Sequence, residues 1–136
     1  MITGYLSDKI QNFLFGLITY EPPQIYYLGL SQTPIAYNGT GALEPSNEEY
    51  NRMAIPNNKT YWSTSANGII RNNLRVSFPE AVTNWGVYSY IFIADALEGG
   101  NILYSSELNM GADVLANTQL FFDSNSLEFS ALPSPV

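Results

Sequence analysis

The 136-residue sequence contains no cysteine and no histidine, and these two absences restrict the chemistry open to it. Without cysteine the chain has no disulfide and no thiolate nucleophile. Without histidine it lacks the side chain that most often acts as a general base or a metal ligand near neutral pH. The commonest catalytic and metal-binding chemistries are therefore excluded.

Positive charge is also scarce. Five residues are basic and twelve are acidic, which gives a formal net charge of −7. The basic residues are dispersed along the chain: Lys9, Arg52, Lys59, Arg71 and Arg75. A groove that follows a phosphate backbone needs clustered cations. The sequence therefore predicts no nucleic-acid partner.

Charged residues of both signs make up 12% of the chain, about half the usual share, whereas aromatic residues make up 14% and ten residues are tyrosine. The surface must then be covered largely by tyrosine and neutral polar side chains. Such a surface is more usual for a protein packed into an assembly than for a free monomer. We predict a subunit of a larger structure, with further copies of itself among its partners.

The acidic residues are the remaining source of chemistry. Six lie near predicted loops, where a glycosidase pair would have to sit: Glu44, Glu48, Glu49, Glu80, Asp95 and Glu98. We interpret them as solvated charges at turns and strand ends. Asp95 and Glu98 could share a calcium ion with Asn101, but the D-x-[DN]-x-[DN]-G ligand series is absent. The sequence predicts no catalytic residue, no cofactor and no metal ligand.

The middle of the chain has the periodicity of β-strands. Residues 74–78 alternate apolar and polar side chains, and residues 87–94 are apolar on both faces, which indicates a strand covered on both sides. Gly99 and Gly100 predict a tight hairpin turn with positive φ before a returning strand over residues 101–109. The residues expected in the core are Trp62, Phe78, Trp85, Ile91 and Ile93.

Eight or nine short strands without an internal repeat predict an all-β fold, mainly an antiparallel β-sandwich of jelly-roll or immunoglobulin-like type. The sequence predicts a long surface loop over residues 32–47, an edge strand over residues 50–55 and a loop over residues 109–113. The expected division is an N-terminal helix over residues 1–20, the β-domain over residues 21–132 and a tail over residues 133–136.

The apolar run in residues 13–18 is too short to span a bilayer, so no membrane insertion is expected. Residues 1–20 instead predict an amphipathic helix, capped by Thr3 and laid over the sheet. Its second half is apolar nearly all round, and neighbours at helical spacing spread over more than half of the circumference. The side chains predicted to form a subunit interface are Phe13, Phe15, Leu17 and Ile18.

An ordered series of short motifs runs along the chain. It comprises Tyr27-Leu28-Gly29-Leu30-Ser31, Glu44-Pro45-Ser46, Tyr50-Asn51-Arg52-Met53-Ala54-Ile55, Trp62-Ser63, Val76-Ser77-Phe78-Pro79-Glu80-Ala81, Trp85-Gly86-Val87, Ile91-Phe92-Ile93-Ala94-Asp95-Ala96 and Gly99-Gly100-Asn101-Ile102-Leu103-Tyr104. This series resembles a family of small tail-fibre or tail-associated proteins of tailed bacteriophages. The resemblance covers about residues 24–132, and its specific part is the order FPEA, WG, GGN.

The resemblance implies a non-enzymatic, β-rich component of the virion, assembled in the host cytoplasm and attached to the tail or baseplate by contacts with other virion proteins. Two alternatives stay open. The first is a capsid decoration or cement protein with the apolar helix half docked on the shell. The second is a lectin-like or glycan-active domain that binds a host surface glycan through tyrosine or tryptophan rings, although Trp62 and Trp85 are predicted to be core residues.

Overall fold

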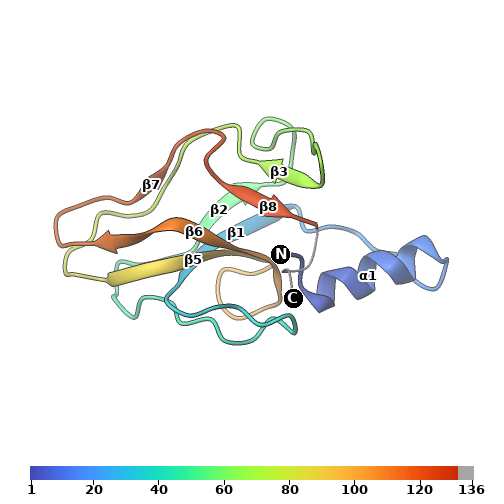
Figure 1. The fold of residues 1–136 in the computed structure, drawn as a ribbon, viewed down its shortest axis with the longest axis horizontal. Coiled ribbons are helices and arrows are strands. Elements are labelled where there is room, and N and C mark those ends of the chain that lie inside the picture. The colour runs from blue at the N-terminus through green and yellow to red at the C-terminus, as the bar shows by residue number, and fades with distance from the viewer. Residues whose placement is uncertain (132–136) are drawn as a thin grey trace.

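A computed structural model describes residues 1–131, and all of its strand pairs are antiparallel. The predicted all-β fold with one N-terminal helix is confirmed (Figure 1). The elements are α1 (Gly4–Leu14), β1 (Ile25–Ser31), β2 (Met53–Pro56), β3 (Ile69–Arg71), β4 (Val76–Ser77), β5 (Gly86–Ala94), β6 (Ile102–Val114), β7 (Phe121–Phe122) and β8 (Glu128–Ser130). The expected tail over residues 133–136 lies outside the described residues.

A four-stranded sheet with the order β2-β1-β5-β6 forms the main layer. The predicted edge strand is β2, and β1 and β5 lie at the centre of the sheet. Two small sheets, β3 with β8 and β4 with β7, complete the fold, and Figure 1 shows β3, β7 and β8 above β5 and β6 of the main sheet. Trp62 forms an isolated bridge with Asn72, and backbone hydrogen bonds from Ser63 to Arg71 and from Asn73 to Tyr61 flank it.

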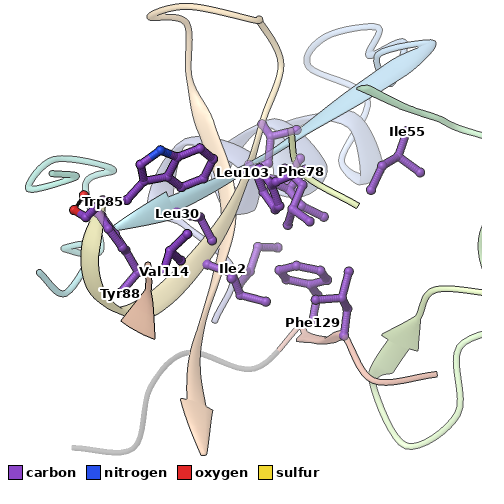
Figure 2. Packing of buried hydrophobic residues seen from close by; sticks show 14 of the residues in the cluster. Ile2, Leu30, Ile55, Phe78, Trp85, Tyr88, Leu103, Val114 and Phe129 are labelled. Atoms are coloured by element: carbon purple, nitrogen blue, oxygen red, sulfur yellow. Dashed lines mark hydrogen bonds between the residues drawn. The ribbon is translucent and has the colours of Figure 1, made fainter. Parts of the chain in front are cut away.

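The main core lies between the four-stranded sheet and the small sheets. Leu28 and Leu30 of β1 and Ile91 and Ile93 of β5 share a cluster with Phe129 of β8. Figure 2 shows the packing of this cluster, with Trp85, Tyr88 and Val114 near one end and Phe129 at the other. Apolar residues spaced two apart on neighbouring strands meet on one face of a sheet, and this spacing explains their common burial.

A second, smaller cluster covers the opposite face of the sheet. Phe92, Ala94 and Ile102 lie there under Ile35, which comes from the long loop after β1. Both faces of β5 are thus covered along its second half, where residues 91–94 are all buried. Gly29 leaves room for the Phe92 ring, since a Cβ at Gly29 would lie 2.3 Å from Cζ of Phe92.

The helix is shorter than the predicted residues 1–20 and ends at Leu14. Gly16 has φ 76°, its N–H donates to the Phe13 carbonyl, and the Leu17 N–H donates to the Asn12 carbonyl. This pair of hydrogen bonds is a Schellman motif, which closes a helix with a glycine in the left-handed region. Gly16 therefore ends the helix, before the chain reaches the prolines that follow Glu21.

The first residues of the chain are part of the core. Ile2 and Leu6 are buried in the main cluster, and Ile2 forms a bridge with Tyr104 of β6. Thr3 precedes the helix but does not cap it through its side chain, because its Oγ1 donates to the carbonyls of Ile102 and Leu103. The base of α1 is therefore anchored to β6, while its far end extends away from the sheet (Figure 1).

The hairpin between β5 and β6 differs from the prediction in two ways. Its turn is a loop over residues 95–101, held by a hydrogen bond from the Asn101 N–H to Oδ1 of Asp95, and is not a tight two-residue turn. The returning strand continues to Val114 and includes residues 109–113, which were predicted as a loop. These residues extend the strand because Gly86 and Val87 of β5 pair with Val114 and Asp113.

Gly99 and Gly100 have φ of 61° and 69°, but their surroundings differ. A Cβ at Gly100 would lie 2.4 Å from Oδ1 of Asp95 and 2.7 Å from Cβ of Ala96, whereas a Cβ at Gly99 would meet nothing within 4 Å. Asparagine tolerates the left-handed region. We expect Gly100→Asn to lower the free energy of unfolding by about 1–3 kcal/mol and Gly99→Asn to change it by less than about 1 kcal/mol. Urea unfolding of both variants checks this, and equal losses would contradict it.

Candidate assembly surface and aromatic pocket

The end of α1 and the turn after it carry a group of exposed apolar side chains, which we call the apolar tip. It comprises Phe13, Leu14, Phe15, Leu17 and Ile18. Phe15, Leu17 and Leu14 are 80%, 72% and 69% exposed. The four residues predicted as a subunit interface all belong to this tip. Because the helix ends at Leu14, three of them are presented by the C-cap and the turn, and helical spacing does not place them.

The composition of the tip is unusual for a surface. No residue of the run from Phe13 to Ile18 is charged, and the nearest charged residues in the sequence are Lys9 and Glu21. By the usual size of large apolar side chains, the tip exposes on the order of 400–500 Å² of apolar surface, a size at which exposed patches are often functional. The tip is therefore the strongest candidate for a protein contact surface on residues 1–131.

A hollow of about 360 Å³ lies beside the tip, between the helix and the sheet, and we call it the helix hollow. It is lined by Leu6, Ile10, Phe13, Tyr20, Pro22, Tyr26 and Tyr104. No charged side chain lines it. Burial raises the pKa of the Tyr20 and Tyr104 hydroxyls above the usual range and that of Tyr26 to about 12. The phenols are therefore neutral and able to donate hydrogen bonds throughout the physiological pH range.

A second hollow of about 220 Å³, the aromatic pocket, adjoins the first and shares Tyr26 and Tyr104 with it. Trp62 lies edge-on to Tyr26 and to Phe129, with ring centroids 6.1 and 6.3 Å apart. The indole N–H of Trp62 donates to the Pro56 carbonyl. The pocket thus offers several rings and few polar groups, and Trp62, predicted as a core residue, is only partly buried.

The other residues predicted for the core lie inside it. Phe78, Trp85, Ile91 and Ile93 are buried in the main cluster. Trp85 packs edge-on against Tyr50 at 5.5 Å, and its indole N–H donates to Oε1 of Glu49 at 2.9 Å. That bond, together with those from the Val82 and Thr83 N–H groups, lowers the pKa of Glu49 to about 2. Glu49 is thus a hydrogen-bonding partner in the fold.

Sequence reasoning missed a buried ion pair. Arg52 is 7% exposed and forms two hydrogen bonds of 3.0 Å to the carboxylate of Glu44. Its Nη1 donates to the carbonyls of Ala96 and Gly99, so the guanidinium holds the loop after β5 against the loop after β1. The sequence held one signal for this pair: Arg52 is one of three arginines in the chain, and it follows Glu44 by eight positions. Arg71 and Arg75 also form ion pairs, with Glu128 and Asp123.

Of the six acidic residues considered as a glycosidase pair, Glu44 and Glu98 line one hollow of about 230 Å³ together with Arg52. Glu44 and Glu49 each belong to the separate networks just described, and the Asp95 carboxylate accepts bonds from the backbone and side-chain N–H groups of Asn101. Within residues 1–131, no group of three or more histidine, cysteine, aspartate or glutamate side chains could hold a metal ion. In the same residues, no helix is long and apolar enough to cross a membrane.

Fold and surface together define a class of protein: a small antiparallel β-domain whose N-terminal helix presents an apolar, uncharged tip. The chain belongs to the protein family described as Podophage GP4 fiber I protein gp80, whose model matches residues 1–130. This is a phage tail-fibre family, so the resemblance drawn from the motifs is confirmed. No curated protein matches the chain. Family membership implies a structural component of the virion in contact with other virion proteins.

Proposed function

We propose that this protein is a non-enzymatic structural and attachment module of the phage tail, placed at the tail fibre or baseplate, and that the apolar tip joins it to its neighbours. The observation that carries the proposal is the exposure of Phe15 and Leu17 at the end of a helix whose base is fixed in the core. Apolar side chains at a protruding, uncharged position gain free energy when a partner covers them. Membership of a tail-fibre family favours the tail over the capsid.

The test uses the double variant Phe15→Ser/Leu17→Ser, supplied to a phage that lacks its own copy of the gene. Both side chains are largely exposed, so the variant is expected to fold, with an unchanged circular dichroism spectrum. We expect its amount in purified virions, measured by quantitative mass spectrometry, to fall at least about tenfold, since about 1.4 kcal/mol of lost contact free energy suffices for that factor.

The matched control is Val82→Ser/Met110→Ser, which removes two equally apolar side chains that are 69% and 85% exposed and lie outside the helix. This control is expected to enter virions at the normal level. Normal incorporation of the folded tip variant would contradict the proposal, because the tip would then contribute nothing to assembly.

A second candidate function is the binding of a host surface glycan, and the aromatic pocket favours it. Sugar rings stack on aromatic side chains, and Trp62 and Tyr26 line an open hollow of about 220 Å³. Titration of the protein with host surface polysaccharide is expected to change tryptophan fluorescence, and Trp62→Leu to abolish the change. An unchanged signal in the wild-type protein would remove this candidate and leave the structural role intact.

A further inference from the structure

We propose that the apolar tip of one copy of this chain inserts into the helix hollow of a second copy. The inference rests on the proposed function, since it names the partner of the same tip. The structure supplies both halves of the contact on one chain: a protruding group centred on Phe15 and Leu17, and an apolar hollow between the helix and β6.

The tip does not fill the hollow of its own molecule. Leu6, Ile10 and Phe13 of α1 line the hollow, but the Schellman turn at Gly16 reverses the chain and leaves Phe15 and Leu17 outside it. Their exposed fractions of 80% and 72% show that no residue among 1–131 covers them. The tip and the hollow therefore both remain open to a second molecule.

The two surfaces match in chemistry. The residues that line the hollow are leucine, isoleucine, phenylalanine, proline and three tyrosines, and none is charged. The tip is uncharged along its whole length. The pairing thus buries apolar surface without burying an unpaired charge.

The area is that of a small stable interface. Specific, stable interfaces bury from about 1,200 Å² in total, roughly 600 Å² on each partner. The tip supplies on the order of 400–500 Å², and Ile10, which is 36% exposed, adds apolar surface from the lining of the hollow. A reciprocal contact, in which each copy offers a tip and a hollow, therefore comes close to the smallest size of a stable homo-oligomer interface.

The experiment measures self-association of the full chain by sedimentation velocity at low and high micromolar concentration. The tip variant is Phe15→Ser/Leu17→Ser, and the hollow variant is Ile10→Glu, which places a carboxylate in the hollow from a partly exposed helical position. Circular dichroism and thermal unfolding establish that each variant is folded. A third sample mixes the two variants in equal amounts.

The wild-type chain is expected to associate, and each variant alone is expected to stay monomeric. In the mixture, the intact tip of the hollow variant meets the intact hollow of the tip variant at one of the two contacts. Complexes containing both chains are therefore expected to form again, at a higher concentration than the wild-type chain needs. Self-association of the hollow variant at the wild-type level would overturn the insertion of the tip into the hollow, and so would a mixture that associates no more than either variant alone at high micromolar concentration.

A wild-type chain that is strictly monomeric at high micromolar concentration would also overturn this inference. That result would leave the proposed function standing if the tip variant were still lost from virions, because the tip would then meet a different virion protein. Failure of the inference and failure of the proposed function are therefore distinguishable.

Discussion

Replacing Trp85 with alanine is expected to lower the free energy of unfolding by about 3–5 kcal/mol. Trp85 is 5% exposed and packs at the end of the main core where Tyr88 and Val114 also lie (Figure 2). Its backbone N–H donates to the Val114 carbonyl, and its carbonyl accepts the Tyr88 hydroxyl. Truncation leaves a cavity among these residues and removes the ring that packs edge-on against Tyr50.

The loss at Trp85 has a second contribution. The carboxylate of Glu49 accepts the indole N–H, and the alanine variant removes this donor while the Val82 and Thr83 N–H groups remain. For a domain of this size, 3–5 kcal/mol corresponds to a fall in Tm of roughly 10–20 °C. Differential scanning calorimetry of the variant measures it.

The matched control for Trp85 is Val87→Ala, two residues further along at a position that is 52% exposed. Its expected effect is within about 0.5–1 kcal/mol, because water already covers much of the valine side chain. A Trp85→Ala variant whose Tm falls by no more than the control would contradict the burial of this ring.

Replacing Arg52 with alanine is expected to lower the free energy of unfolding by about 3 kcal/mol or more. The guanidinium satisfies the Glu44 carboxylate and the carbonyls of Ala96 and Gly99 at the same time, and it lies 5.1 Å from the centre of the Phe92 ring. Its removal leaves the partly buried Glu44 carboxylate with the Tyr50 hydroxyl as its remaining donor, and it takes one donor from each of the two carbonyls. Urea unfolding, followed by fluorescence, measures the loss.

Arg71→Ala is the control for Arg52. Arg71 pairs with Glu128 at 2.9 Å, but the two side chains are 37% and 53% exposed, so this pair is expected to contribute less than about 1 kcal/mol. Arg52→Lys is also expected to destabilise the protein, because an ammonium group cannot reproduce the two parallel bonds to Glu44. Equal losses from Arg52→Ala and Arg71→Ala would contradict the structural role of the buried pair.

The sequence predicted those parts of the fold that follow from local periodicity. Residues 87–94 are apolar on both faces, and the strand they form is central to the sheet and covered on both sides. The apolar run from Phe13 to Ile18 could likewise be recognised from the sequence as a candidate contact surface, and the structure leaves it exposed. Both predictions depend on neighbouring residues only, and they needed no knowledge of the tertiary arrangement.

The parts that could not be predicted depend on contacts between distant segments or on a single backbone conformation. The end of the helix is set by Gly16 in the left-handed region, and a prediction based on apolar spacing continued to residue 20. Residues 109–113 look like a loop because Gly111 interrupts them, but Ala112 and Asp113 pair with β5 beyond a register shift in the ladder. The hollow beside α1 joins residues from both halves of the chain, so no local pattern could reveal it.

The absence of cysteine allows a direct measurement of the central claim, that the apolar tip is covered in the assembled phage. Leu17→Cys places a single thiol in the tip, and Val82→Cys places one at a position of similar exposure outside it. In the free proteins, both thiols are expected to react with a maleimide at similar rates. In purified virions, the thiol at position 17 is expected to react at least about tenfold more slowly than the thiol at position 82. Equal labelling of the two positions in virions would contradict the account.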